Sequence, residues 1–235
     1  MPFVNHRVFS PPEDRGLTIW RYLDLPRLLN LVQHRALWFA RGDQLGDPWE
    51  GSLSAATFRE HGANTPRIAR SWLLKAAVNC WHLGEHESVA MWERYGRSSA
   101  PVAIRSTVQR LIDALNASQE VVFIGEVSYI DYDNVAMSVD NAMYPILHKR
   151  LSYSFEHELR AVTIIPSPAD AGTIDLSNNP LGLYVAVDLM RLIEAIYVAP
   201  TSPAWFVETV TDAVRTALGV DVPVRQSRLG EEALF

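Results

Sequence analysis

The segment from Tyr153 to Ile165 constrains the fold of this chain more than any other stretch of its sequence. Glu156, Glu158 and Arg160 stand at every second position, and the apolar run Ala161 to Ile165 follows directly. Because successive side chains of a β-strand point to opposite faces, this spacing predicts a strand with three charged side chains on one face. The opposite face is expected to carry Phe155, His157 and Leu159.

Two carboxylates on one face of a strand repel each other unless a cation, a ligand or a proton separates them. Arg160 is one such cation next to Glu156 and Glu158. The pair therefore has two interpretations. It is either a functional carboxylate pair or part of a structural Glu–Arg network near the end of a sheet, since structural networks also perturb pKa values.

The composition is typical of an ordinary globular protein. The chain has 235 residues, of which 48% are apolar and 20% charged, enough for one sizeable domain or two small ones. No segment approaches the roughly 20 apolar residues that span a bilayer, and the first 15 residues lack the apolar core of a secretory signal. Cys80 is the only cysteine, which agrees with a reducing compartment. A cytoplasmic location without a membrane partner is expected.

The net charge of the chain indicates which partners it is suited to bind. A formal net charge of -6 argues against a protein whose main affinity comes from neutralising a phosphate backbone, so bulk binding of nucleic acid is not expected. A local basic strip is conceivable from Arg59, Arg67, Arg70 and Lys75. The last three of these also fit the solvated face of an amphipathic helix.

Short strands and helices alternate along the chain, without an internal repeat or a long linker. The pattern predicts one α+β domain over 17–229, with a mixed or antiparallel sheet and flanking helices, an N-terminal extension at 1–16 and a tail at 230–235. Pro26 after Asp24 is expected to open a helix, and Thr107 to cap another. Further predictions are helices over 66–78 and 138–150, and one long strand over 120–131 with Gly125 as a bulge.

Two other motifs have a functional and a structural interpretation. Asp47 to Glu50, the sequence Asp-Pro-Trp-Glu, lies in a glycine-bounded loop after a predicted strand, where functional side chains concentrate; it also fits a turn with Pro48 at its second position. Trp92 and Tyr95 stand three residues apart on a predicted helix. They are either core residues or the wall of a pocket that stacks a planar ring.

Several kinds of site lack their basic requirement. His82 and His86 could share a helical face, but Gly84 lies between them and no third ligand follows, so no metal site is predicted. The chain contains no GxGxxG, Walker or GxSxG motif. A phosphate-binding glycine loop and a serine-hydrolase site are therefore not predicted.

Taken in order, the motifs resemble a large and mostly uncharacterised bacterial family, a domain of unknown function often found beside defence genes. The resemblance covers Ile19 to Leu229. Ala40 and Gly46 depart from it, since the family usually has Ser and Asn there. The motifs are Trp20-Arg-Tyr22, Ala36 to Ala40, Gly46 to Glu50, Cys80 to His82, Met91 to Tyr95, Lys149 with Tyr153 to Arg160, Ile193 to Pro200 and Arg225 to Leu229.

A weaker resemblance is to ADP-ribosyltransferases that carry an Arg on the first strand, an aromatic-x-Ser strand and a later Glu-x-Glu strand. Arg21, the segment Trp38 to Ala40, and Glu156 with Glu158 follow that order, although Ala40 replaces the serine that supports the catalytic Glu. The resemblance implies an ADP-ribosyltransferase-like fold, NAD as cofactor and an acceptor that the sequence does not identify.

The same resemblance implies roles for individual residues. Glu158 would be the catalytic carboxylate and Glu156 would position the acceptor. Arg21 would bind a phosphate or ribose of the cofactor. Aromatic residues would line the cofactor pocket, with candidates Tyr22, Trp38, Phe39, Trp92 and Tyr95.

Two alternatives belong to other classes of protein. The first is a non-catalytic module that senses a nucleotide or a partner through an aromatic and acidic pocket. The second is a metal-dependent hydrolase or nuclease, which would need Asp47, Glu50, Glu156 and Glu158 to converge, because clustered carboxylates bind Mg²⁺ through their oxygens.

Overall fold

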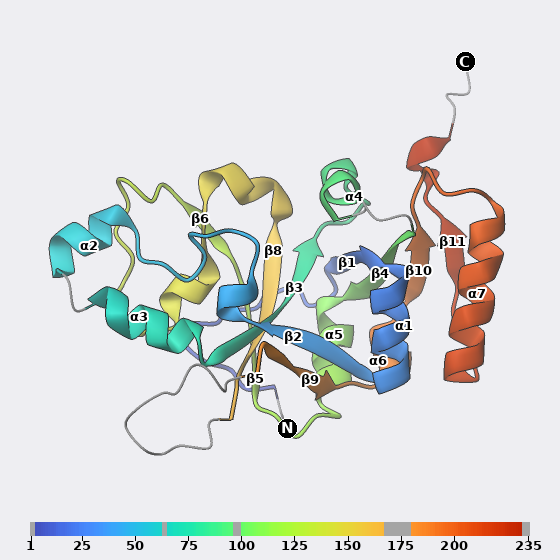
Figure 1. Ribbon diagram of the computed structural model, residues 1–235, viewed down its shortest axis with the longest axis horizontal. Coiled ribbons are helices and arrows are strands. Elements are labelled where there is room, and N and C mark those ends of the chain that lie inside the picture. Colours follow the sequence, from blue (N-terminus) through green and yellow to red (C-terminus); the bar gives the residue numbers. More distant parts are fainter. Residues whose placement is uncertain (1–2, 63–64, 96–99, 167–179, 232–235) are drawn as a thin grey trace. The chain divides into compact units, whose positions relative to one another are not determined.

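The structure is a computed structural model that describes residues 3–62, 65–95, 100–166 and 180–231 (Figure 1). Strands and helices alternate along the chain, and the strands form a mixed, mostly antiparallel sheet with flanking helices. The predicted α+β class is confirmed. The predicted domain bounds stay a prediction, and residues 232–235 of the predicted tail lie outside the described part.

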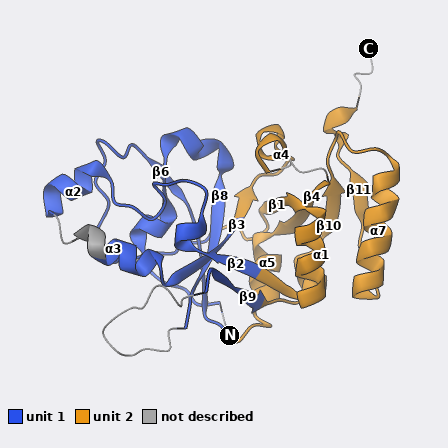
Figure 2. Cartoon of the chain, in the orientation of Figure 1, with its two compact units in different colours: residues 1–11, 38–80, 120–185 blue, residues 12–37, 81–119, 186–235 orange. Residues whose placement is uncertain are grey.

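The chain divides into two compact units, each assembled from three separate segments (Figure 2). Unit 1 comprises residues 1–11, 38–80 and 120–185, and unit 2 comprises residues 12–37, 81–119 and 186–235. Strand β3 (Ala76–Leu83) contributes its first five residues to unit 1 and its last three to unit 2.

In unit 2, strand β1 (Thr18–Asp24) pairs antiparallel with β4 (Pro101–Thr107) along its whole length. On its other side β1 pairs with the end of β3, Trp20 opposite His82. The sheet continues from β4 to β10 (Ala195–Val198), and then in parallel to β11 (Val224–Gln226). The helical elements are α1 (Leu25–His34), α4 (Val89–Tyr95), α5 (Val108–Leu115), α6 (Leu189–Leu192), α7 (Trp205–Leu218) and the 3₁₀ turn η4 (Arg228–Gly230).

Two predicted helix starts in unit 2 are confirmed by their caps. The carboxylate of Asp24 accepts a hydrogen bond from the main-chain N–H of Arg27 at 2.8 Å, and Pro26 lies in the first turn of α1. The hydroxyl of Thr107 accepts from the N–H of Arg110 at 3.2 Å and so begins α5. In both places a side-chain oxygen satisfies an N–H that the helix leaves unpaired.

In unit 1, strand β8 (Glu158–Ile164) pairs with β3 and, antiparallel, with β5 (Val122–Glu126). Strand β2 (Ala36–Arg41), whose first two residues belong to unit 2, pairs with β3 and neighbours β9 (Gly182–Ala186), whose last residue belongs to unit 2. A second small sheet pairs β6 (Ser128–Ile130) in parallel with β7 (His148–Arg150). The helical elements are η1 (Gly42–Gln44), α2 (Ala55–His61), α3 (Thr65–Leu73), η2 (Tyr144–Leu147) and η3 (Leu151–Glu156).

Two predicted elements are too long. The helix predicted over 66–78 ends at Leu73, because the small residues from Ala76 onward are buried in strand β3. The strand predicted over 120–131 divides at Val127, whose N–H donates to the carbonyl of Glu158 at 2.9 Å. Gly125 keeps its place opposite Arg160 in the ladder and forms no bulge.

The predicted helix over 138–150 is wrong. That stretch contains η2 and strand β7 instead, and Pro145, which lacks an N–H, lies where a continuous helix would need a donor. The predicted start of the following strand is wrong as well. Glu156 ends the 3₁₀ helix η3, His157 adopts a left-handed conformation with φ of 37°, and β8 begins only at Glu158.

Candidate functional site

The predicted site residues fall into both units. Arg21, Tyr22, Trp92 and Tyr95 belong to unit 2. The remaining candidates belong to unit 1: Trp38, Phe39, Asp47, Glu50, Glu156, Glu158 and Arg160.

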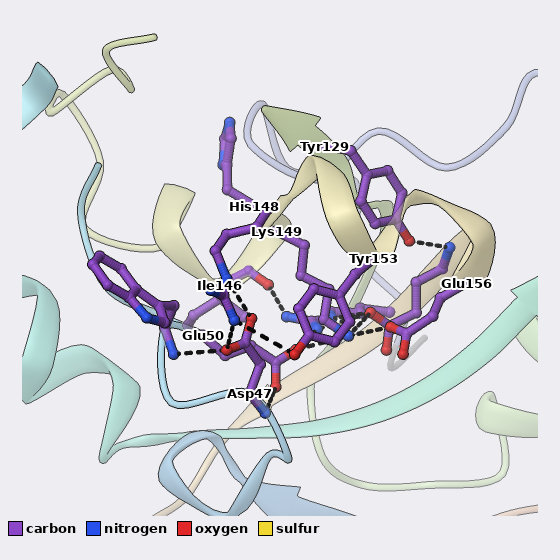
Figure 3. Close-up of polar contacts among 12 residues, drawn as sticks. Asp47, Glu50, Tyr129, Ile146, His148, Lys149, Tyr153 and Glu156 are labelled. Atoms are coloured by element: carbon purple, nitrogen blue, oxygen red, sulfur yellow. Dashed lines mark hydrogen bonds and ion pairs between the residues drawn. The ribbon is translucent and has the colours of Figure 1, made fainter. Parts of the chain in front are cut away.

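Unit 1 contains a buried cluster of five charged side chains, Glu50, Lys149, Glu156, Glu158 and Arg160, which we call the charge cluster. The ammonium of Lys149 contacts all three carboxylates: Oε1 of Glu50 at 3.0 Å, Oε2 of Glu158 at 3.2 Å, and Glu156. The guanidinium of Arg160 contacts Oε2 of Glu158 at 2.8 Å and also Glu50. Figure 3 shows Glu50, Lys149 and Glu156 converging from separate segments of the chain.

Local structure brings these side chains together. Lys149 is the middle residue of β7, and its partner in β6 is Tyr129. The Tyr129 hydroxyl accepts a hydrogen bond from the main-chain N–H of Glu158 at 2.9 Å, which ties the small sheet to the start of β8. The left-handed residue His157 separates Glu156 from Glu158. Both glutamates therefore reach the same ammonium although they do not share a regular strand.

The charge cluster is largely shielded from water. All five side chains are buried, and Arg160 has an exposed fraction of 0%. Burial of isolated ions costs several kcal/mol each, so such groups persist only when they are paired and hydrogen-bonded. Here two cations face three carboxylates, which leaves the cluster with one formal negative charge.

The ionisation of Glu158 follows from its neighbours. Burial by itself would raise the pKa of the Glu158 carboxyl, but the charges of Arg160 and Lys149 outweigh it and hold the pKa at about 2. Burial would lower the pKa of Lys149, yet the surrounding carboxylates raise it above its ordinary value. Both groups are therefore charged at neutral pH.

Cys80 is a neighbour of the cluster. Burial raises the pKa of its thiol well above the ordinary value, and the negative charge of Glu158 adds to that effect. The thiol therefore remains protonated. Cys80 packs against the apolar core of unit 1, as its sequence context indicates, and does not have the thiolate character of a nucleophile.

The loop segment Asp47 to Glu50 forms a turn that is anchored at both ends. The carboxylate of Asp47 accepts from the N–H of Trp49 at 3.1 Å and pairs with Arg150 at 2.7 Å. Glu50 joins the charge cluster. Asp47 and Glu50 also line a cavity of about 650 Å³ within unit 1. The turn interpretation and a functional interpretation therefore apply to the same residues.

A convergence of four carboxylates on a metal ion is not what this geometry provides. Glu50, Glu156 and Glu158 do converge, but on the ammonium of Lys149, while Asp47 pairs with Arg150. Over residues 3–62, 65–95, 100–166 and 180–231, no group of three or more His, Cys, Asp or Glu side chains is arranged to hold a metal ion.

The aromatic candidates differ in burial. In unit 2, Tyr22 and Trp92 are buried and pack edge to face with ring centroids 5.0 Å apart. Tyr95 is exposed, although it follows Trp92 by three residues on α4. In unit 1, Phe39 is a core residue, whereas Trp38 is exposed beside Tyr184.

Arg21 is half-buried, and its guanidinium lies over the ring of Trp81, 6.0 Å from the centroid. Its predicted contact with a phosphate or ribose stays a prediction. The same holds for the aromatic residues named as cofactor-binding candidates.

Lys149 is the central residue that sequence reasoning did not assign to the site. It was visible only as part of a motif. The sequence did contain a signal. A lysine followed within a dozen residues by Glu-x-Glu-x-Arg can supply a second positive charge, because one arginine neutralises only one of the two carboxylates.

Comparisons with known proteins give distant structural similarity only. No known protein family and no curated protein matches the sequence, so the resemblance to the uncharacterised bacterial family stays a prediction. Two structures of DarT from Thermus sp. 2.9 are similar, one in complex with NAD+ (12% identity) and one with carba-NAD+ (11%). Both have a TM-score of 0.39, cover 92% and 93% of this chain, and are covered over 97% of their own length. That score is too low for function to be inferred from the likeness. Among the helices described, none is long and apolar enough to cross a bilayer.

Replacement of Lys149 by Met tests the charge cluster as a structural unit. The variant leaves three buried carboxylates with Arg160 as the cluster's one cation, so we expect the free energy of unfolding to fall by about 3–5 kcal/mol. Arg191→Met is the matched control, because Arg191 pairs with Asp188 at 3.1 Å on the surface and should cost less than about 1 kcal/mol. Urea denaturation followed by circular dichroism measures both. A Lys149→Met variant as stable as the control would contradict the expectation.

The lowered pKa of Glu158 makes stability depend on pH. Since the carboxyl titrates near 4.5 in an unfolded chain and at about 2 in the fold, its ionised form stabilises the protein fully above pH 4.5. That contribution, about 3 kcal/mol, is lost as the pH falls from 4.5 to 2. Between pH 7 and about pH 3.5, wild type should lose about 1 kcal/mol more than Glu158→Gln, which cannot titrate. Urea denaturation at both pH values checks this, and equal losses would contradict it.

Proposed function

We propose that this protein is an NAD-dependent ADP-ribosyltransferase or NAD glycohydrolase in which Glu158 is the catalytic carboxylate. The observation that carries the proposal is the state of that side chain. The Glu158 carboxylate is held ionised, with a pKa of about 2, by Arg160 and Lys149, and the Tyr129 hydroxyl accepts a hydrogen bond from the main-chain N–H of Glu158 at the start of β8.

The chemistry requires a carboxylate in this state. Cleavage of the nicotinamide–ribose bond passes through an oxocarbenium-like state, as glycoside hydrolysis does, and a fixed anion stabilises the developing positive charge without reorganising. The one formal negative charge that the charge cluster retains also stabilises positive charge that develops on the ribose. A carboxyl group that burial kept protonated at neutral pH would lack this advantage.

The two glutamates have different surroundings. The Glu158 side chain retains an exposed fraction of 7%, against 1% for Glu156. Glu156 contacts Lys149 and so acts as a positioning residue for that ammonium. Glu158 is therefore the better candidate for contact with substrate, and the predicted role of Glu156 toward an acceptor stays a prediction.

An exposed aromatic side chain of unit 1 also supports the proposed function. Trp38 on β2 is exposed and offers an aromatic face of the kind that stacks on nicotinamide. NAD is the first ligand to test, because the order of Arg21, Trp38 and the Glu156–Glu158 pair resembles that of ADP-ribosyltransferases. The acceptor, whether a macromolecule or water, is left to experiment.

A second candidate is a nucleotide-binding module without turnover. One observation favours it. Oε2 of Glu158 forms ion pairs with both Lys149 and Arg160, so this oxygen is already engaged by cations inside the protein. In that case the charge cluster supports the turn from Asp47 to Glu50, and the ligand contacts side chains around it.

One assay separates the two candidates. The purified full chain is incubated with NAD, with and without cell lysate, and free nicotinamide and covalent ADP-ribose are measured by mass spectrometry. We expect product from wild type and a loss of at least about 10²-fold in Glu158→Gln, the size of effect seen when one electrostatic contact to a transition state is removed. Glu194→Gln is the matched control, because Glu194 forms a half-buried pair with Arg105 at 2.8 Å in unit 2.

The outcomes are distinct. Glu158→Asp keeps the charge and, if folded, shows whether carboxylate position matters when Glu158→Gln loses stability. NAD binding without product in any protein would favour the module. If NAD does not bind and no product forms, both candidates are overturned.

A further inference from the structure

The cavity in unit 1 is bounded by the turn from Asp47 to Glu50 and by residues of α2 and α3. Its volume of about 650 Å³ falls within the range of pockets that bury small ligands. We infer that this cavity binds a free mononucleotide, that is, an aromatic base joined through a ribose to a phosphate monoester. The charge, the aromatic surface and the rigidity of its wall each favour such a ligand.

The acidic side chains of the cavity wall are already balanced by cations. Each has a partner within the fold: Asp43 with Arg41 at 2.6 Å, Asp47 with Arg150 at 2.7 Å, and Glu50 with Lys149 at 3.0 Å. Each of these three carboxylates is therefore already engaged by a cation inside the fold.

The arginines of the same wall are not balanced in this way. Arg59 on α2 donates to the main-chain carbonyl of Asp133, and Arg70 lies exposed on α3. In the described part of the chain no carboxylate pairs with either guanidinium. Arg59 and Arg70 therefore bring positive charge to the cavity without a carboxylate partner, and guanidinium groups are well suited to phosphate. Of the basic strip considered from sequence, Arg59 and Arg70 line the cavity, while the side chain of Arg67 lies outside the described residues.

Two large aromatic side chains line the cavity without being buried. Trp49 is 47% exposed and Phe58 48% exposed. Trp49 is held in place by the edge of Tyr132, with centroids 6.2 Å apart, and by Arg150, 5.6 Å from the ring. Exposed aromatic faces next to cationic side chains are the combination that stacks a base and pairs its phosphate.

The wall is rigid because it packs directly on α3. Gly51 has φ of 69°, a conformation that other residues rarely adopt. A Cβ atom at Gly51 or at Gly42 would overlap the side chain of Leu73. Glu50, next to Gly51, is anchored in the charge cluster by Arg160. A site with a fixed wall loses little entropy when a ligand binds.

This inference does not depend on the proposed reaction. Trp49, Phe58, Arg59 and Arg70 all lie outside the charge cluster, so nucleotide binding at the cavity and turnover at Glu158 can succeed or fail separately.

Isothermal titration calorimetry of the full chain tests the inference with AMP, GMP, CMP and UMP, and with adenosine and inorganic phosphate as partial ligands. We expect at least one monophosphate to bind, and both partial ligands to bind at least about tenfold more weakly. The double variant Arg59→Gln/Arg70→Gln should weaken the monophosphate at least about tenfold. The matched control Arg27→Gln/Arg191→Gln changes two exposed arginines outside unit 1 and should leave affinity unchanged.

Fluorescence supplies a second readout for the same site. A stacked base should quench Trp49, so Trp49→Phe should remove the ligand-dependent quenching while monophosphate binding by calorimetry persists. Absence of binding by every monophosphate, unchanged affinity in the arginine double variant, or tighter binding of an RNA oligonucleotide would each overturn the inference.

Measuring NAD consumption beside AMP binding distinguishes the cavity proposal from the proposed reaction. If AMP binds with the arginine dependence described while no NAD is consumed, the cavity proposal stands and the reaction fails. If NAD is consumed in a Glu158-dependent way and no monophosphate binds, the reaction stands and the cavity proposal fails.

Discussion

The ammonium of Lys149, enclosed by the carboxylates of Glu50, Glu156 and Glu158, is the interaction on which the rest of unit 1 depends. Each carboxylate comes from a different local structure: a turn, the end of a 3₁₀ helix and the start of a strand. A buried charge tolerates few arrangements, because an unpaired ion in a dry interior is strongly unfavourable. The ammonium therefore fixes three chain segments in one geometry, and Arg160 completes the balance.

The charge cluster serves the surface around it by holding the turn that carries Trp49. Glu50 faces inward to Lys149 and Arg160, whereas Trp49, its neighbour in sequence, remains exposed on the cavity wall. Stability and ligand binding are thus coupled through adjacent residues. Such coupling is the expected design for a binding site, in which contact residues are oriented by a second layer of hydrogen bonds and ion pairs.

Burial and reactivity compete at Glu158. The cations that keep this carboxylate ionised also neutralise part of its field, so the same contacts support a fixed anion and restrict its access to substrate. This competition is why a transferase and a binding module both remain consistent with one arrangement of charges. The transferase uses the ionised carboxylate directly, and the module uses only the order that the cluster imposes on its surroundings.

The sequence by itself determined the α+β class, the helix starts at Asp24 and Thr107, and the shared strand face of Glu158 and Arg160, because caps and alternation are local signals that depend on neighbouring residues. Only the tertiary structure decided that Lys149 stands among the glutamates, that His157 breaks the expected strand, and that 138–150 is not helical. The place of Lys149 depends on pairing between segments about 100 residues apart, such as Glu50 and Lys149. Charge balance across such separations has no periodic signature, so it appears only once the chain has folded.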